Sequence, residues 1–314
     1  MTLVWVIGCG GLLGGALHHE LSQNLATLFD PNTKFSWNNK YIASKEFEVA
    51  VNNFAMEAKQ AAWKIYWAAG IGTMHSSAEA LEDETYILES IVAFLLNHKT
   101  LNLKSGSFIF SSSAGAIYAG IQNDIITEST SPSPINSYGQ IKLKQESAIC
   151  ALNKGGDGAN VAICRISTLF GIKQKNGKQQ GLLAEIARRT LSNQVVHIYV
   201  PLDTMRDYIS AEMAAKKMIQ FASMLEKRPG IYIKVIASEV SISIAQILAI
   251  IKKISKRNIK VVTQADKKSA QYQRIVQFKS EVLMPSDIHF HETSIEGLAQ
   301  LLRAMQKEIA KGNT

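Results

Sequence analysis

The sequence predicts an α/β protein with a doubly wound parallel sheet and a smaller C-terminal domain. Two observations lead to this fold class. Short apolar runs alternate with helical stretches through the first half of the chain, which is typical of βαβ units. In addition, a glycine-rich turn follows the first apolar run. Because βαβ crossovers are right-handed, we expect helices on both faces of the sheet and ligands at the carboxyl ends of its strands.

The predicted strands of the first half are short, and each ends at a turn or a helical stretch. They are LVWVIG (3–8), NLATLFD (24–30), WKIYWAAG (63–70), SGSFIFSSS (105–113) and NVAICRIS (160–167). The helical stretches are 12–23, about 77–96 and 138–154. We assign residues 1–171 to the first domain.

The pattern loosens after Gly171, where a polar loop leads into a second set of elements. The predicted helices there are 182–191, 211–225, 241–255 and about 294–311, and the predicted strands are 194–200, 230–236 and 258–264. We assign residues 172–314 to a smaller α/β domain that binds the substrate. Residues 203–225 should pack back on the first domain.

Composition and charge exclude several classes of protein. The chain has 314 residues, of which 46% are hydrophobic and 19% are charged, as in an ordinary globular protein. No apolar run is long enough to span a membrane, and the apolar N-terminus lacks the basic residues of a secretory signal. The three cysteines, Cys9, Cys150 and Cys164, lack paired or metal-like spacing, which fits the reducing cytoplasm.

The net charge of +8 has two readings. Nucleic-acid binders usually carry a basic face interleaved with aromatic residues or a recognisable motif. The basic residues here are spread along the chain, with concentrations at 171–178 and 252–260. We therefore expect no nucleic-acid partner, and an anionic small substrate such as a diphosphate suits the charge equally well.

The turn GCGGLLG joins the first strand to the first helix. Gly8, Gly11 and Gly14 form a G-x-x-G-x-x-G pattern, in which glycine lets backbone N–H groups approach a pyrophosphate at the helix N-terminus. Asp30 ends the next strand, 22 residues after Gly8, where an acid can accept from the adenosine ribose. The first domain is therefore predicted to be a dinucleotide-binding Rossmann domain.

The position of Asp30 also bears on the choice of cofactor. A carboxylate there would repel a 2′-phosphate, so NAD is favoured over NADP, although Lys34 is near enough to keep NADP open. The alternative is that Asp30 is a surface turn residue before Pro31.

Two further segments carry side chains suited to proton transfer. In FSSSAGAIY, a strand ends in serine hydroxyls at the edge of the sheet where ligands bind, although a serine-rich turn would read the same way. In NSYGQIK, Tyr138 and Lys142 are four residues apart and share one face of a helix. A nearby ammonium favours the tyrosinate, which makes a phenol usable as a base near neutral pH. Alone, Y-x-x-x-K occurs in many helices by chance.

The order of the motifs is more specific than any one of them. GCGGLLG, WAAG, SSSAGAIY, YGQIK, RISTLFG and RDYI follow one another along the chain. In this order they resemble the extended short-chain dehydrogenase/reductases, specifically the NAD-dependent epimerase/dehydratase family that acts on nucleotide sugars. The 25 residues from Ser113 to Tyr138 also resemble the spacing in UDP-galactose 4-epimerases. The resemblance covers nearly the whole chain and specifies the family better than the substrate.

The resemblance implies roles for the catalytic residues. Tyr138 would remove a proton from a sugar hydroxyl as hydride leaves the sugar carbon, or return it in the reverse direction. Lys142 would bind the nicotinamide ribose and tune Tyr138. Ser113 would hold the reacting oxygen. Ala69 and Gly70, at the end of the WAAG strand, would pass beside the cofactor.

On the substrate side, the resemblance implies three contacts. Thr168 stands where many members carry a substrate-binding asparagine, and Gln180 lies in a segment that resembles the loop over the sugar nucleotide. Arg206 of RDYI is suited to a diphosphate. A structural ion pair of Arg206 with Asp207 or another acid is an open alternative.

The chain also departs from the family pattern. Family dehydratases carry an Asp–Glu pair after the active-site hydroxyl, whereas this chain has Ala114 and Gly115, so a 4,6-dehydratase is not expected. The usual aspartate that touches adenine is missing between Asp30 and WAAG. The histidines His75, His197, His289 and His291 show no ligand spacing tied to a carboxylate cluster, so we expect no metal.

Two classes of function remain from the sequence. The first is an NAD(P)-dependent nucleotide-sugar epimerase or keto-sugar reductase that acts on a nucleotide-diphosphate sugar. The second is a non-catalytic dinucleotide sensor on the same fold, although such proteins usually lose the tyrosine or the lysine. The resemblance further implies a homodimer, built by helices at 89–98 and 141–152, and suggests a bacterial surface-polysaccharide pathway.

Overall fold

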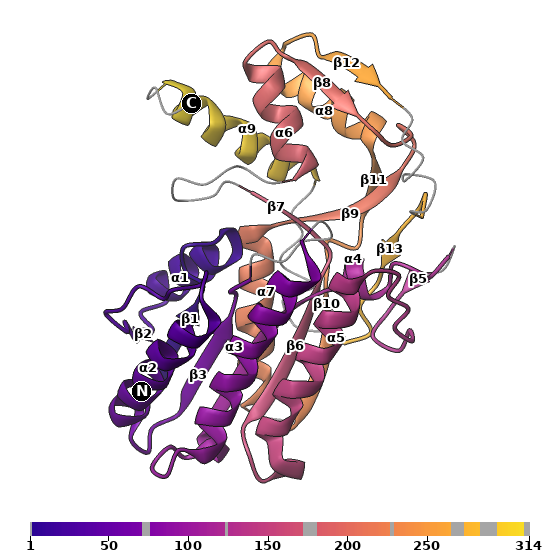
Figure 1. The fold of residues 1–314 in the computed structure, drawn as a ribbon. Coiled ribbons are helices and arrows are strands. Elements are labelled where there is room, and N and C mark those ends of the chain that lie inside the picture. Colours follow the sequence, from indigo (N-terminus) through magenta and orange to yellow (C-terminus); the bar gives the residue numbers. More distant parts are fainter. Residues whose placement is uncertain are drawn as a thin grey trace.

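A six-stranded parallel sheet forms the centre of the molecule in the computed structural model (Figure 1). The structure describes residues 2–70, 76–122, 125–171, 181–226, 229–264, 273–282 and 294–310. The strands are β1 (Leu3–Ile7), β2 (Thr27–Leu28), β3 (Trp63–Trp67), β4 (Gly106–Ser113), β6 (Asn160–Ile166) and β10 (Ile231–Ile236). Their order across the sheet is β10-β6-β4-β3-β1-β2. The predicted doubly wound parallel sheet is therefore confirmed.

Helices cover both faces of this sheet, as predicted. One face packs against α1 (Leu12–Gln23) and α7 (Ala211–Leu225), and the other packs against α2 (Lys40–Ala58), α3 (Ala78–Asn97) and α5 (Ser137–Cys150) (Figure 1). Two short 3-10 helices complete this part of the chain. Helix η1 (Leu103–Ser105) directly precedes β4, and η2 (Ala151–Gly156) directly follows α5. The result is a three-layer arrangement with the sheet in the middle.

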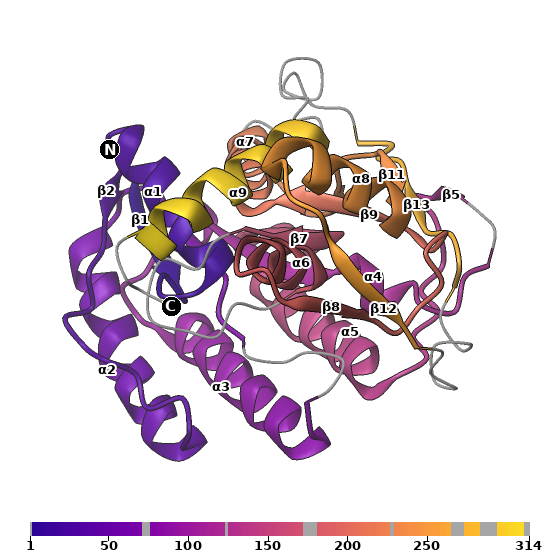
Figure 2. The same ribbon diagram turned by 90° about the horizontal axis from the view of Figure 1, so that it is seen from above.

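A smaller group of elements lies beyond the carboxyl edge of the main sheet (Figures 1 and 2). It contains α6 (Leu182–Leu191), α8 (Ile244–Ser255), α9 (Ser294–Ala310), β7 (Thr168–Phe170), β8 (Val195–Ile198), β9 (Met205–Ser210), β11 (Ser241–Ser243) and β12 (Lys260–Thr263). These elements share their own apolar core, which includes Leu183, Ile186, Ile247 and Leu302. The short elements α4 (Ala114–Ile117), β5 (Ile125–Ile126) and β13 (Gln277–Phe278) lie beside it.

The chain passes between the two parts more than once. After β6, which ends at Ile166, it enters the smaller part at β7, and then α7 and β10 return to the main sheet. The boundary at residue 171 stays a prediction. The return of α7 falls within residues 203–225, while β10 lies beyond them.

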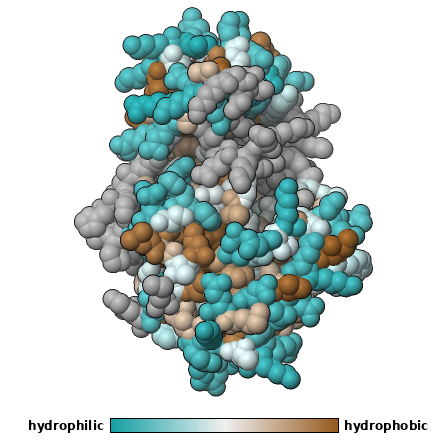
Figure 3. Space-filling model, turned by 90° about the vertical axis from the view of Figure 1, so that its left-hand side faces the viewer, coloured by the Kyte–Doolittle hydropathy of each residue, from teal (hydrophilic) through white to brown (hydrophobic). Residues whose placement is uncertain are grey.

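On the side of the molecule that carries α1 and α2, hydrophilic side chains cover much of the described surface and hydrophobic side chains lie among them in small groups (Figure 3). Among the described residues, the helices are too short or too polar to cross a membrane.

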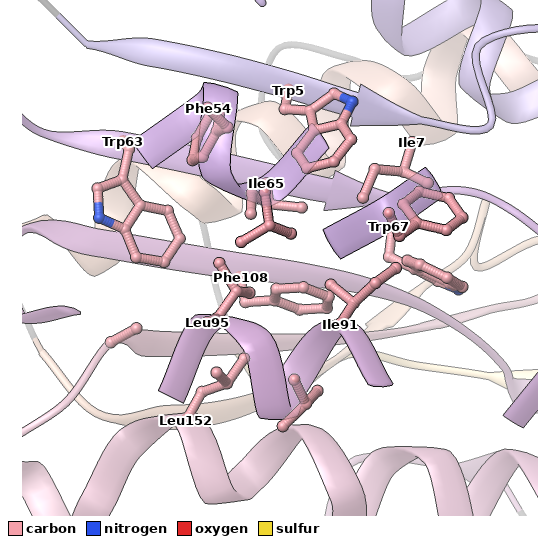
Figure 4. Close-up of a cluster of buried hydrophobic side chains, with 14 of the residues drawn as sticks. Trp5, Ile7, Phe54, Trp63, Ile65, Trp67, Ile91, Leu95, Phe108 and Leu152 are labelled. Atoms are coloured by element: carbon pink, nitrogen blue, oxygen red, sulfur yellow. The ribbon is translucent and has the colours of Figure 1, made fainter. Parts of the chain in front are cut away.

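Large aromatic side chains fill the core between the sheet and helices α2, α3 and α5 (Figure 4). In β3, Trp63, Ile65 and Trp67 point to this face, while Tyr66 packs on the opposite face. Both sets are buried, since a parallel strand covered on two sides must be apolar throughout. The carboxyl ends of these packed strands carry the candidate site.

Candidate active site

The glycine turn connects β1 to α1 through two close backbone approaches. Gly8 has φ +94°, and its carbonyl oxygen accepts a hydrogen bond from the Gly11 N–H at 2.9 Å. A Cβ atom placed on Gly14 would lie 2.0 Å from that same carbonyl oxygen, so only glycine lets α1 pack on the turn. A Cβ atom on Gly10, in contrast, would meet nothing within 4 Å.

The open side of this turn fits a pyrophosphate. The first turn of α1 contains no acidic residue, and the N-cap Gly11 has no side chain to satisfy the first N–H groups. Such a helix N-terminus binds anions through its free N–H groups and its dipole. The structure therefore has the predicted turn between β1 and α1, built by Gly8, Gly11 and Gly14, and its backbone N–H groups could hold a dinucleotide.

Asp30 follows β2 and is exposed. One of its carboxylate oxygens, Oδ1, accepts a hydrogen bond from the Asn32 N–H at 2.9 Å. Asp30 is thus a surface turn residue, which was the alternative to a cofactor contact in the sequence analysis. The turn uses only Oδ1 in this hydrogen bond, so Oδ2 can still accept from a ligand. Lys34 is exposed in the same loop.

The end of β3 lies directly beside the glycine turn. A Cβ atom on Gly8 would come within 2.6 Å of the backbone nitrogen of Ala69. Gly70 follows with φ +143°. The structure therefore brings together the two segments that the sequence assigned to the cofactor.

The packing of α5 on α4 brings together the segments that carry Ser113 and Tyr138. Ser113 ends β4 and is the N-cap of α4. The side chain of Asn136 caps α5 by accepting from the Gly139 N–H at 2.9 Å. A Cβ atom on Gly139 would lie 2.5 Å from the Ala116 carbonyl oxygen, so glycine permits this contact. Tyr138, next to Gly139, is half-buried at this junction.

Lys142 lies on the same side of α5 as Tyr138, as the spacing predicts. Its Nζ atom is 5.8 Å from the centroid of the Tyr138 ring and 5.3 Å from that of Phe110. The structure adds two partners that were not predicted. Lys142 Nζ is 3.1 Å from the Glu84 carboxylate and donates to Gln145 Oε1 at 2.8 Å.

A second buried network fixes α5 to the sheet. Arg165 of β6 donates to both carboxylate oxygens of Glu146 at 3.0 and 2.6 Å, and Ser112 of β4 donates to Glu146 at 2.6 Å. Arg165 also donates to the Tyr118 hydroxyl at 2.5 Å. Burial raises the pKa of Tyr118, which Arg165 only partly opposes. This network holds the helix that carries Tyr138 and Lys142.

The predicted substrate residues lie on the smaller part of the molecule or outside the described residues. Thr168 is exposed at the start of β7 and pairs with Tyr208 of β9. Arg206 of β9 donates to the carbonyl oxygens of Met205 and Gln273 at 2.7 and 2.6 Å. Gln180 lies outside the described residues.

The alternative ion pair between Arg206 and Asp207 does not form. Asp207 points elsewhere and accepts from Ser167 at 2.5 Å and from the N–H and hydroxyl of Ser238 at 3.0 and 2.9 Å. Burial raises the pKa of Asp207 and lowers that of Arg206. The Arg206 guanidinium is thus oriented by neutral carbonyl groups.

Within the described ranges, no three histidine, cysteine or acidic side chains gather to hold a metal ion. His197 lies on β8 with its ring 6.4 Å from that of Tyr199. His75, His289 and His291 fall outside the described residues.

The glycine turn beside the end of β3 and the Tyr138–Lys142 pair on α5 define a class, a Rossmann-like α/β protein with a glycine turn of the dinucleotide-binding type and a tyrosine–lysine pair on a neighbouring helix. The sequence matches the model of the NAD dependent epimerase/dehydratase family over residues 4–233. The chain therefore belongs to this family, as the order of motifs predicted. A comparison with curated proteins found no match.

Solved structures of sugar-nucleotide epimerases share the fold. UDP-glucose 4-epimerase of Thermotoga maritima, solved with UDP-glucose, is 17% identical with a TM-score of 0.76, and the match covers 98% of this chain and 100% of the other. UDP-N-acetylglucosamine 4-epimerase of Methanobrevibacter ruminantium is 18% identical with a TM-score of 0.75 and 98% coverage of both chains. UDP-glucuronic acid 4-epimerase of Bacillus cereus, solved with its substrate and NAD, is 16% identical with a TM-score of 0.74, covering 98% of this chain and 99% of the other.

Proposed function

We propose that this protein is an NAD-dependent enzyme that oxidises and reduces a carbon of a nucleotide-diphosphate sugar, as a 4-epimerase or a keto-sugar reductase. The observation that carries the proposal is the position of Lys142 Nζ, 5.8 Å from the ring of Tyr138 on the shared face of α5. Family membership and the glycine turn support the cofactor half of the proposal.

We assign the roles of the side chains from the family resemblance and from their positions. NAD, when bound, supplies the hydride acceptor. Tyr138 takes the proton of the sugar hydroxyl that is oxidised and returns it on reduction. Lys142 favours the charged phenolate by its positive charge. Ser113, at the end of β4, donates to the reacting sugar oxygen and keeps it beside Tyr138.

The substrate assignment rests on chemistry and on the relatives. Arg206 offers a guanidinium that is oriented by backbone carbonyl groups and can pair with a diphosphate. The similar solved structures hold UDP-glucose or UDP-glucuronic acid. We assign Thr168 and Gln180 to the sugar end of the substrate. Ala114 and Gly115 cannot supply the acid and base of a dehydration, so we do not expect 4,6-dehydratase activity.

We assign the adenosine ribose to Asp30 and favour NAD over NADP, because a 2′-phosphate would meet the carboxylate. We also propose a cytoplasmic homodimer, assembled along α3 and α5, in a surface-polysaccharide pathway. All three cysteines are free thiols, which suits a reducing compartment. Much of the apolar face of α3 is already used in the core, so light scattering at micromolar concentration is the direct test, and a clean monomer would contradict the dimer.

The function is tested by assaying purified protein with a panel of UDP-sugars. Two measurements are needed, the NAD that remains bound after purification and the sugar product of each incubation. An epimerase should retain its NAD and interconvert two sugars, whereas a reductase should consume added NADH. Protein that binds NAD but turns over none of the panel would favour the dinucleotide sensor instead.

A further inference from the structure

A buried cluster of polar side chains joins α3 to α5 next to Tyr138. It consists of Glu84 and Thr85 on α3 and Lys142 and Gln145 on α5. Lys142 donates to Glu84 and Gln145, and the Gln145 amide donates to Thr85 at 3.1 Å and to Glu84 at 3.3 Å. The side chains of Lys142 and Glu84 are only 6% and 5% exposed. A buried charge pair with this many hydrogen bonds holds one geometry.

The cluster restricts the direction in which Lys142 can reach a ligand. An ammonium has three N–H donors, and Glu84 and Gln145 engage two of them. The Glu84 carboxylate also lies against the end of β3, because a Cβ atom on Gly70 would be 2.8 Å from its Oε1 atom. Glu84 therefore connects the strand end assigned to the cofactor with the lysine assigned to catalysis.

Glu84 also affects the charge near Tyr138. A carboxylate 3.1 Å from the ammonium offsets the positive charge that would favour the tyrosinate. Other charges on the packed elements have partners of their own: Glu146 pairs with Arg165, which also binds Tyr118, and Lys144 pairs with Glu82. Within the described ranges, Glu84 is thus the carboxylate that pairs with Lys142.

We propose that Glu84 is a positioning residue for the proton transfer: it holds Lys142 in place, offsets part of the lysine's charge, and so sets the pH range in which Tyr138 acts as a base. This inference rests on the proposed role of Tyr138. It makes the base strength of Tyr138 depend on a residue of another helix, 54 positions earlier in the sequence.

The test is a spectrophotometric pH titration of the full-length protein that follows the ultraviolet absorbance of the phenolate. The chain has nine tyrosines, so the titration of Tyr138→Phe is subtracted to isolate Tyr138. Glu84→Gln keeps the shape and removes the charge, and it should lower the Tyr138 titration midpoint by about one pH unit or more. The acid limb of the pH–rate profile should move in the same direction. Glu84→Asp, which keeps the charge, should restore the wild-type midpoint.

A matched control is available on the same two helices. Glu82 pairs with Lys144 at 2.9 Å, but both side chains are about half exposed, so Glu82→Gln should leave the Tyr138 titration unchanged. Equal midpoints in wild type and Glu84→Gln would overturn the proposal. Equal shifts in Glu84→Gln and Glu82→Gln would also overturn it, since the effect would then be one of general charge.

A second pair of variants serves if Glu84→Gln does not fold with an unpaired buried ammonium. Lys142→Met should raise the Tyr138 midpoint, and the double variant Lys142→Met, Glu84→Gln, which buries no unpaired charge, should reverse most of that rise. No difference between the single and double variants would overturn the role of Glu84. Failure of the proposed function is separate: it would show as unchanged turnover in Tyr138→Phe, whatever the titration gives.

Discussion

The two sides of the active-site edge are built in different ways. On the side of β1 and β3 the site consists of backbone, with glycines that let the turn, α1 and the end of β3 touch. On the side of β4 and α5 it consists of side chains that are held by buried hydrogen bonds and ion pairs. A substitution of a glycine on the first side should change geometry, whereas Tyr138→Phe on the second side should change chemistry and leave the geometry intact.

Tyr138→Phe should have the largest effect. It removes one oxygen from a half-buried ring and should reduce turnover by about 10²–10⁴-fold, the usual contribution of a positioned acid–base group. Thermal unfolding and cofactor binding should stay near wild type. The turnover of wild type and variant is measured on a true sugar substrate, and a thermal melting curve of each serves as the control for folding. Wild-type turnover would remove the catalytic role of Tyr138.

Gly14→Ala should come next, and its damage should be structural. The new methyl group would meet the Gly8 carbonyl at 2.0 Å, so we expect a loss of about 3 kcal/mol in the free energy of unfolding and weaker NAD binding. Gly10→Ala is the matched control, because its methyl group meets no protein atom within 4 Å. It should keep the stability and lose only NAD affinity. Chemical denaturation and calorimetric titration with NAD separate the two outcomes, and equal stability of both variants would contradict the close approach.

Asp30→Asn should have a smaller effect that is confined to binding. The loss of a charge-assisted hydrogen bond costs about 1.5–3 kcal/mol, and NAD should be weakened more than NADP because the repulsion of a 2′-phosphate is relieved. The variant keeps an oxygen that can accept from Asn32, so the turn should persist. Dissociation constants for both cofactors provide the test, and equal binding of NAD and NADP by the wild type would remove the role of Asp30.

Glu82→Gln should have the smallest effect. This residue joins α3 to α5 through Lys144, as Glu84 does through Lys142, yet its ion pair is exposed. Exposed pairs contribute less than about 1 kcal/mol to stability. Denaturation of Glu82→Gln and Glu84→Gln in parallel should show a clear loss only for the buried pair. A comparable loss for Glu82→Gln would mean that burial does not distinguish the two pairs.

The sequence by itself determined the central strands β1, β3, β4 and β6, because they are covered on both faces and are therefore largely apolar runs. It also determined α6 and α7, whose predicted limits agree with the structure. The glycine turn and the Tyr138–Lys142 pair were equally readable, since each depends on residues close together in the chain. Helix α2 (Lys40–Ala58) was missed, although Phe47, Val51 and Phe54 follow helical spacing and Asn39 caps its start. The strand predicted at 24–30 shortened to Thr27–Leu28, because it pairs only with β1 at the edge of the sheet.

Tertiary structure alone decided which charges meet. Glu84 looks in the sequence like a solvent-facing helix residue beside Glu82 and Asp83, yet it is buried against Lys142. The return of β10 to the main sheet and the hydrogen bond from Arg206 to the Gln273 carbonyl likewise join segments far apart in the chain. Sequence patterns report which residues share a face of one element. The pairing of faces from different elements depends on packing, and packing decides that Lys142 meets Glu84.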